Sequence, residues 1–286
     1  MRTDLSPAEK ITAAAVRDSF NDAAVVMHYA RAAHQLGLWA SERLLIEQWF
    51  PDKAAPLLEL GCGAGRVTFG LWDLGYRDLT ALDFAEELLE QARSLAALRA
   101  VDAIRFIQAD ATKLSQCHLF ADKTPASEGG ICAGRNDEAQ QGTDRPDFAG
   151  ALFMFNGLMQ IPGRENRRKA FREIRSVCRP GARFLFTTHD REDDPHARLC
   201  WADEAARWAR GGQDPRLIEF GDRWFANELG GRTFMHLPVR AEVVEDLTAT
   251  GWTLLFDAMR RAVAPESAAV REFSDECRFW VAERGE

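Results

Sequence analysis

The most specific signal in the sequence is LLELGCGAGRV, residues 57–67. A short apolar strand runs into Gly61, Gly63 and Gly65, and a helical pattern follows at once. Glycines permit a sharp turn and let a ligand approach the backbone, while the helix N-terminus offers free N–H groups. Asp83 ends the next strand, 20 residues after Gly63, where a carboxylate can bind both hydroxyls of a ribose. The stretch therefore predicts an α/β fold with a nucleoside-binding loop.

The spacing of the glycines narrows the choice of ligand. The loop reads GxGxG, and Arg66 stands where a dinucleotide site needs a third small residue. This departure argues against NAD, FAD and a bound pyrophosphate.

Strand and helix patterns alternate on both sides of this loop, from residue 56 to residue 188. This alternation predicts a doubly wound, mostly parallel sheet with right-handed crossovers. The continuous apolar run FAGALFMF suits a parallel strand that is covered on both faces. The expected strands are residues 56–60, 79–83, 104–108, 148–155, 183–188, 252–259 and 277–283.

The remaining segments are additions to this single domain of residues 1–286. Residues 1–50 are expected to form a helical lid. Residues 115–147 are polar and glycine-rich, which predicts a mobile loop insertion, and residues 190–237 read as a cap inserted after the fifth strand, with a hairpin around ANELGG. The helix at about 164–178 carries several basic residues on one face, which we expect to be solvated.

Composition excludes several classes of protein. Hydrophobic residues make up 46% and charged residues 28% of the 286 residues, which is ordinary for a globular protein and excludes disorder of the whole chain. The net charge of −8 argues against a nucleic-acid partner. No apolar run approaches the roughly 20 residues that cross a bilayer. With no secretory signal and six scattered cysteines, we expect a soluble cytoplasmic protein without a metal site.

Several motifs together resemble those of the class I S-adenosylmethionine-dependent methyltransferases. They are ELGCGAG (59–65), ALD (81–83), QADAT (108–112) and RPGARFLFTTHD (179–190). The resemblance covers residues 20–190 and, more loosely, the last two expected strands. It implies a Rossmann-like sheet of seven strands with the last one antiparallel, S-adenosylmethionine as cofactor and S-adenosylhomocysteine as product.

The resemblance also implies roles for individual residues. Glu59 would lie near the methionine amino group, and Gly61, Gly63 and Gly65 would follow the cofactor backbone. The other implied cofactor-binding residues are Asp83 at the ribose hydroxyls, Phe84 along the adenine, Asp110 and Ala111 at the adenine edge, and Phe155 and Asn156 near the methionine and methyl group.

The acceptor of the methyl group is less well defined by the sequence. FNGLMQIP (155–162) differs from the Asn/Asp-Pro-Pro-aromatic motif of enzymes that methylate base or amide nitrogens, which favours a small-molecule acceptor. We expect His189, Asn156 and Tyr29 to be catalytic, with His189 as a base or a polar contact to the acceptor. His236, at the end of the predicted hairpin, is a further candidate for the same cleft.

Three alternatives remain open at this point. The chain could methylate protein or RNA, with Arg167, Arg168 and Lys169 as the docking patch, or bind S-adenosylmethionine without catalysis. An aminopropyl transferase on the same fold is a third alternative, although it prefers acidic residues where Asn156 stands. The identity of the acceptor, the atom methylated and the oligomeric state are not defined by the sequence.

Overall fold

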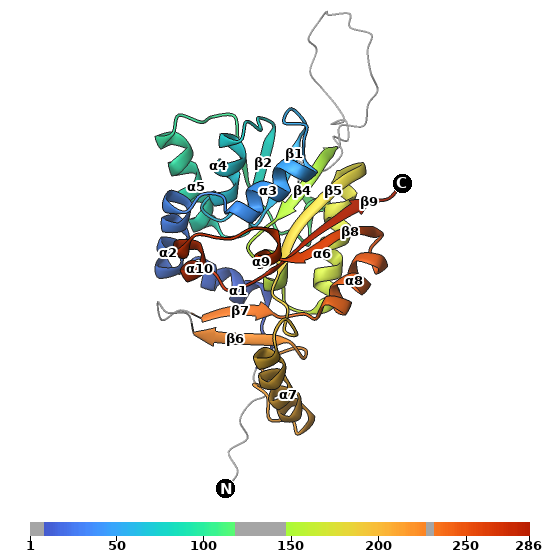
Figure 1. Ribbon diagram of the computed structural model, residues 1–286. Helices are drawn as coiled ribbons and strands as arrows, with labels where there is room; N and C mark the ends of the chain where they lie inside the picture. The colour runs from blue at the N-terminus through green and yellow to red at the C-terminus, as the bar shows by residue number, and fades with distance from the viewer. Residues whose placement is uncertain (1–8, 118–146, 227–231) are drawn as a thin grey trace, which may run out of the picture.

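The computed structural model describes residues 9–117, 147–226 and 232–286. A seven-stranded sheet runs through it in the order β3-β2-β1-β4-β5-β9-β8 (Figure 1). Its strands lie where the sequence predicts them, so the doubly wound, Rossmann-like fold is confirmed. They are β1 Leu57–Leu60, β2 Leu79–Asp83, β3 Arg105–Gln108, β4 Phe148–Phe153, β5 Cys178–Thr188, β8 Trp252–Met259 and β9 Arg278–Arg284.

The direction of the strands follows from how they are connected. β1 pairs in parallel with β2 and β4, because a helical crossover separates each strand from its sheet neighbour. β9 pairs antiparallel with both β5 and β8, as predicted for the last strand. β5 begins earlier than expected, because Cys178 already pairs with Phe148 of β4. The register of the β4–β5 pair then shifts between Phe148 and Gly150.

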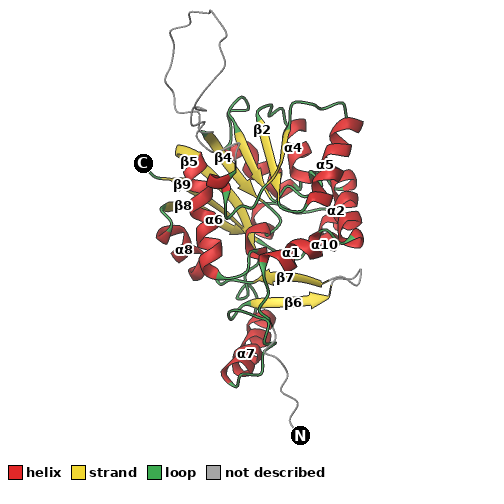
Figure 2. Cartoon of the chain, turned by 180° about the vertical axis from the view of Figure 1, so that it is seen from behind, coloured by secondary structure: helices red, strands yellow, loops and turns green. Residues whose placement is uncertain are grey.

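Helices cover both faces of the sheet. Figure 2 shows α6 and α8, whose side chains pack with β4, β5 and β9 in one buried cluster. Side chains of α3, α4 and α5 pack in a second cluster against the opposite face. The helices are α1 Ala13–Phe20, α2 Ala23–Gln35, α3 Ala40–Trp49, α4 Arg66–Asp73, α5 Glu86–Leu98, α6 Arg164–Val177, α7 Pro195–Ala209, α8 Arg240–Ala249, α9 Arg260–Val263 and α10 Ala268–Phe273, with short 3-10 turns η1 Leu114–Gln116 and η2 Gly157–Gln160.

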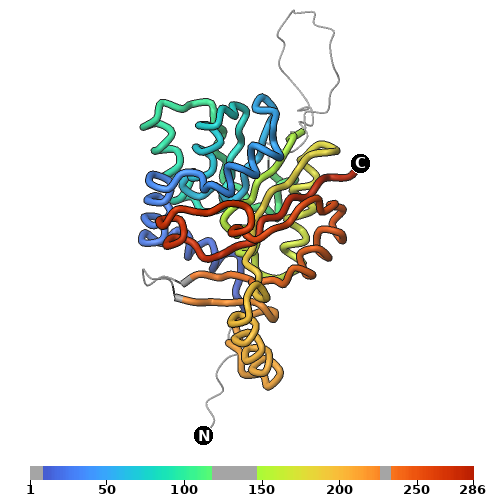
Figure 3. The backbone as a smooth tube through the Cα atoms, in the orientation of Figure 1, coloured from blue at the N-terminus to red at the C-terminus, as the bar shows by residue number. Residues whose placement is uncertain are grey.

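The segment after β5 forms α7 and a separate two-stranded sheet, as the hairpin prediction required. Its strands are β6 Asp222–Ala226 and β7 Arg232–His236. Figure 3 shows the hairpin at one end of the molecule, with α7 beyond it. β7 packs against α1 and η2, and Phe234 lies in a third buried cluster with Val16 and Phe20 of α1. The hairpin thus supports α1.

Most of the expected loop of residues 115–147 lies outside the described residues, which resume at Asp147. Residues 115 and 116 belong to η1. Among the described residues, no helix combines the length and the apolar character that spanning a membrane requires.

Candidate cofactor and acceptor site

The glycine loop joins β1 to α4 with three positive φ angles, at Gly61 (+61°), Gly63 (+54°) and Gly65 (+90°). A Cβ atom on Gly61 would lie 2.6 Å from the Phe153 ring, so this position also needs glycine for space. A Cβ atom on Gly63 would meet nothing within 4 Å. Gly63 lines a cavity at the ends of β1, β2 and β4, so its open side leaves room for a ligand to approach the backbone.

Asp83 connects the end of β2 to this loop. Its carboxylate accepts hydrogen bonds from the backbone N–H groups of Gly63 and Ala85, both at 2.8 Å. Burial raises the pKa of Asp83 to about 6, although these hydrogen bonds act in the opposite direction. The carboxylate also lines the cavity, so its remaining lone pairs can accept from ligand hydroxyls.

Glu59, at the third position of β1, is the second buried carboxyl group of the cavity. Thr68 Oγ1 donates to its Oε2 at 2.5 Å. Burial raises the pKa of Glu59 to about 8, so the side chain is mostly protonated at pH 7 in the free protein. A cationic ligand group placed beside it would reverse this balance and favour the carboxylate.

These groups lie in one cavity of about 320 Å³ at the ends of β1, β2 and β4. Nine of the residues proposed from the sequence line it: Tyr29, Glu59, Gly61, Gly63, Asp83, Phe84, Asp110, Ala111 and Phe155. Gly65 is absent from the lining in the described chain; a Cβ there would lie 2.7 Å from the Phe69 ring, so this glycine serves the packing of α4.

Asp110 differs from the other acidic residues of the site. Its Oδ1 already accepts from the N–H and hydroxyl of Thr112, and its Oδ2 lies 3.6 Å from Lys113 Nζ. Such hydrogen bonds are typical of an aspartate whose side chain stabilises the turn that follows it, yet the Asp110 side chain still borders the cavity. Asp110 therefore caps the turn and borders the ligand space at once.

Asn156 and His189 are arranged differently from our expectation. Among the described residues, neither lines the cavity. Nδ2 of Asn156 lies 3.1 Å from His189 Nε2, and His189 Nδ1 lies 2.9 Å from the Glu276 carbonyl oxygen. Because a carbonyl only accepts, Nδ1 carries the proton and Nε2 accepts from Asn156. Burial lowers the pKa of His189, which agrees with a neutral ring.

This arrangement gives no support to His189 as a base that contacts the acceptor. Both its ring nitrogens are engaged, and it holds the side chain of Asn156 instead. Phe155 and Asn156 have φ angles of +53° and +60°, which are rare for residues with a side chain. Backbone strain of this kind costs about 1–3 kcal/mol per residue and gathers at ligand sites. The Asn156–His189 contact thus stabilises the turn that presents Phe155 to the cavity.

A wall of aromatic side chains, which the sequence analysis did not identify as a group, closes the other side of the cavity. Tyr29 meets Phe155 edge-on, with ring centroids 5.9 Å apart, and Phe273 of α10 packs against Phe155 at 5.4 Å. Phe20 of α1 contacts both Tyr29 and Phe84. Val16 and Phe20 are four residues apart on α1, a spacing that could have indicated a shared face. Nothing in the sequence near Phe273 indicates its position.

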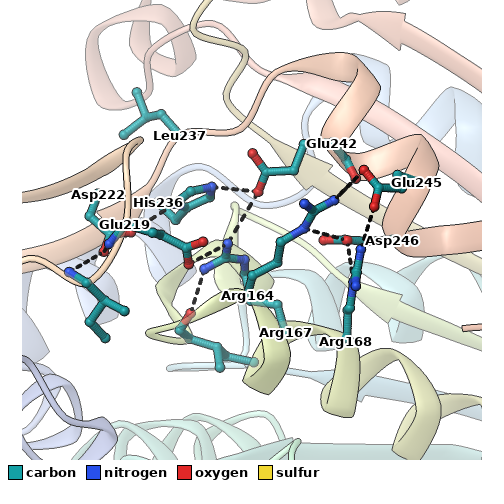
Figure 4. Close-up of polar contacts among 12 residues, drawn as sticks. Arg164, Arg167, Arg168, Glu219, Asp222, His236, Leu237, Glu242, Glu245 and Asp246 are labelled. Carbon is teal, nitrogen blue, oxygen red and sulfur yellow. Dashed lines mark hydrogen bonds and ion pairs between the residues drawn. The ribbon is translucent and has the colours of Figure 1, made fainter. Parts of the chain in front are cut away.

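The basic face of α6 is only partly solvated, whereas we expected solvent around all of it: Arg172 is exposed, but Arg167 and Arg168 are not. Arg167 is fully buried, and its Nη2 lies 2.9 Å from Glu219 and 3.3 Å from Glu242 (Figure 4). Arg168 pairs with Asp246 of α8 at 2.7 Å. The prediction failed because the acidic partners come from α8 and the cap, which lie more than 50 residues away in sequence. His236 is likewise buried in this network and, among the described residues, is not in the cavity lining.

The comparisons with known proteins agree with this geometry. Residues 57–126 match the model of the methyltransferase domain family. No curated protein matches the sequence significantly. Among solved structures, a protein described as an S-adenosylmethionine-dependent methyltransferase from Methanosarcina mazei is similar with a TM-score of 0.59 and 18% identity, covering 87% of this chain and 99% of its own.

Two further structures extend the similarity over nearly the whole chain. The [4+2]-cyclase SpnF has a TM-score of 0.60 at 16% identity, covering 98% of this chain and 99% of its own. The 1,6-didemethyltoxoflavin-N1-methyltransferase of Burkholderia thailandensis has a TM-score of 0.55 at 17% identity, covering 100% of this chain and 93% of its own. At such identities these similarities concern the fold.

Residues 57–126 match a methyltransferase domain, and the strand order and the glycine loop are those of the class I S-adenosylmethionine-dependent methyltransferase fold. S-adenosylmethionine is the cofactor that this domain and this fold imply. The residues present fit that molecule, because Gly63 leaves its backbone open to the cavity and Asp83 presents a carboxylate beside it.

Proposed function

We propose that this enzyme transfers the methyl group of S-adenosylmethionine to a small, largely apolar molecule by in-line displacement. The observation that carries the proposal is that the glycine loop and a wall of aromatic side chains line one and the same cavity. Aromatic walls bind planar or apolar ligands with large buried area. A cavity of about 320 Å³ is within the usual range for small-molecule sites.

In this proposal the chain mainly binds, orients and excludes water. The cofactor, when bound, supplies a methyl group that its sulfonium already activates. Asp83 and the backbone of Gly63 hold the ribose side, and Glu59 faces the amino group. Phe84, Asp110 and Ala111 border the adenine, while Phe155 borders the methionine. Alignment and exclusion of water then account for most of the rate enhancement.

Tyr29 is the residue of α2 that we assign to the acceptor. Burial raises the pKa of Tyr29 to about 12, so its phenol keeps the proton at neutral pH. Tyr29 therefore serves as a hydrogen-bond donor and an edge-on aromatic contact, and not as a base. We assign Asn156 and His189 to positioning, because His189 holds the Asn156 amide behind the cavity.

Particular observations count against or in favour of the two alternatives, which are methylation of RNA or protein and a role without methyl transfer. The docking patch for RNA or protein would consist of Arg167, Arg168 and Lys169, but Arg167 and Arg168 are already paired with carboxylates and Lys169 lines the cavity. One observation favours a role without methyl transfer: a similar structure is described as a [4+2]-cyclase.

For location we propose the cytoplasm, since the five described cysteines are free thiols, which suits a reducing compartment.

The test is transfer of label from methyl-labelled S-adenosylmethionine into a cell extract that is separated by size after incubation. Label in the small-molecule fraction supports the proposal, and chromatography then identifies the acceptor. The Asp83→Ala variant is the control, because it should bind the cofactor more weakly and transfer less label once circular dichroism has established that it is folded. Label in protein or RNA contradicts the proposal, and so does a protein that binds S-adenosylhomocysteine tightly but labels neither fraction in extracts from several sources.

A further inference from the structure

His236, at the end of β7, is a fully buried histidine held between two carboxylates. Its Nδ1 lies 2.8 Å from Asp222 Oδ1 on β6, and its Nε2 lies 2.8 Å from Glu242 Oε1 on α8 (Figure 4). A carboxylate can only accept a hydrogen bond, so each ring nitrogen must donate one. The geometry therefore requires the doubly protonated, positively charged ring.

The groups around His236 balance its charge. Asp222 also accepts the backbone N–H groups of Ile218 and Glu219 through Oδ2. Glu242 further faces two cations, Arg167 of α6 at 3.3 Å and Arg191, between β5 and α7, at 3.7 Å. Glu219 pairs with Arg167 at 2.9 Å. Three carboxylates thus face three cations, of which only His236 can lose its charge near neutral pH.

The backbone of Gly221 packs closely against one edge of the His236 ring. Gly221, in the turn before β6, has a φ of +110°. A Cβ atom there would lie 2.7 Å from His236 Cε1 and 2.7 Å from Arg191 Nη1. The backbone therefore approaches this edge of the ring more closely than a residue with a Cβ atom would allow.

This network reaches the wall of the cavity through Arg167. Arg167 Nη1 donates to the carbonyl oxygen of Ile161 at 3.3 Å, and Ile161 lines the cavity together with Gln160 of η2. β7 itself packs against η2 and against α1, whose Val16 and Phe20 also line the cavity. Two walls of the ligand space therefore rest on the element that His236 fixes.

We propose that His236 is a positioning residue whose proton locks the β6–β7 hairpin to α6 and α8, and thereby holds the α1 and η2 walls in the conformation that binds ligand. The consequence for ligand binding rests on the proposed function, whereas the lock itself does not. Loss of the proton leaves a nitrogen lone pair facing a carboxylate at 2.8 Å, so the hairpin loosens and the ligand affinity falls.

The sign of the pH dependence follows from the ring's surroundings. Burial alone would lower the pKa of His236, but the hydrogen bonds to Asp222 and Glu242 outweigh it and raise the pKa above 6.5, against some opposition from Arg167. The stabilisation is therefore fully present below pH 6.5 and is lost as the pH rises through the higher value in the folded protein.

The same side chains include a possible set of metal ligands, since atoms of Glu219, Asp222 and His236 lie within 4.8 Å of one another. Arg167 and the two hydrogen bonds of the ring already occupy these atoms. A metal ion would have to displace a buried guanidinium and take both a proton and a hydrogen bond from His236. The charge balance therefore favours a second proton on His236 over a bound metal ion.

The experiment measures the melting temperature and the affinity for S-adenosylhomocysteine between pH 6 and 9.5, at constant ionic strength. It compares the wild type, His236→Gln and Asp222→Asn with His196→Gln, a control at an exposed histidine of α7. We expect the wild-type dissociation constant to rise at least fivefold more than that of His236→Gln as the pH increases. The wild-type melting temperature should fall over the same range. Asp222→Asn should shift both transitions to lower pH, and His196→Gln should follow the wild type.

Two results would overturn the proposal. One is a pair of superimposable pH profiles for the wild type and Asp222→Asn, a variant that keeps the shape of the side chain if His236→Gln does not fold. The other is a melting temperature that Zn²⁺ raises in the wild type but not in Asp222→Asn, which would identify a metal site. If S-adenosylhomocysteine fails to bind at any pH, the proposed function fails, but the melting curves still test the lock.

Discussion

At the scale of single residues, the cavity contains two buried carboxyl groups that would form different interactions with a bound ligand. In the proposed function, Asp83 accepts hydrogen bonds from the ribose hydroxyls, whereas Glu59 faces a cationic amino group. Burial raises the pKa of both groups, to about 6 and about 8 respectively. At pH 7 the free protein therefore holds Asp83 mostly ionised and Glu59 mostly protonated. Each state leads to its own prediction.

Replacement of Asp83 by Ala should weaken binding of S-adenosylhomocysteine by about 1.5–3 kcal/mol, the range of hydrogen bonds to a charged group. Titration calorimetry measures this loss directly. The backbone N–H of Gly63 also loses its partner, so circular dichroism should first establish that the variant is folded. An unchanged affinity would show that the ribose does not bind at Asp83.

Glu59 should release a proton when the cofactor product binds. The free carboxyl group has a pKa of about 8, and a cationic amino group beside it would lower that value below 7. At pH 7 we therefore expect a release approaching one proton per ligand bound. Calorimetry in two buffers with different ionisation enthalpies measures it. Glu59→Gln should abolish the release, and a release that persists in this variant would assign the proton to another group.

At the scale of elements, α6 shows how the charges of one helix divide between structure and solvent. Arg167 is buried against Glu219 and Glu242, whereas Arg172 pairs with Glu165 on the exposed side of the same helix. The two arginines lie five residues apart, yet only one faces desolvated carboxylates. Removing a partner from a buried pair leaves a charge without compensation, and this costs far more than losing a surface pair.

Arg167→Met should therefore lower the free energy of unfolding by about 3–5 kcal/mol, while Arg172→Gln should lower it by roughly 0.5 kcal/mol or less. Urea unfolding at pH 7 gives both values, with Arg172→Gln as the matched control. Equal effects of the two substitutions would mean that the pairs around Arg167 contribute no more than a surface pair.

The sequence predicted the positions of the strands and of the glycine loop better than the side-chain contacts between elements. The run FAGALFMF and the segment LTALD define their strands by local apolar pattern, and the glycine spacing defines the loop, because these signals act within a few residues. The pairing of Arg167 with Glu219, or of His236 with Glu242, depends on how the cap and α8 pack, which no local pattern records. The contact of His189 with Glu276 was not predicted for the same reason, since the two residues lie 87 positions apart in the sequence.

At the scale of the whole molecule, the cavity is assembled from segments that lie far apart in the chain. The glycine loop and the strand ends supply one side, and α1, α2 and α10 supply the other. α1 and α2 belong to a small buried cluster with β7, separate from the two large clusters on the sheet. This cluster has fewer buried side chains than either of the others, so we expect it to open at lower free energy than the sheet.

Binding of S-adenosylhomocysteine should therefore slow amide hydrogen exchange most strongly in α1, α2 and η2, and only slightly in β1 and β4, which are already protected in the free protein. Ligand contact with Tyr29 and Phe20 adds buried surface to α1, which packs against β7, and to α2, which packs against α4 and α5. Exchange followed by mass spectrometry, with and without ligand, measures the difference segment by segment. α7 is the internal control, because among the described residues none of its side chains lines the cavity. Protection confined to the glycine loop, with α1 and α2 unchanged, would contradict this prediction: the ligand would then occupy a cavity whose N-terminal wall it does not stabilise.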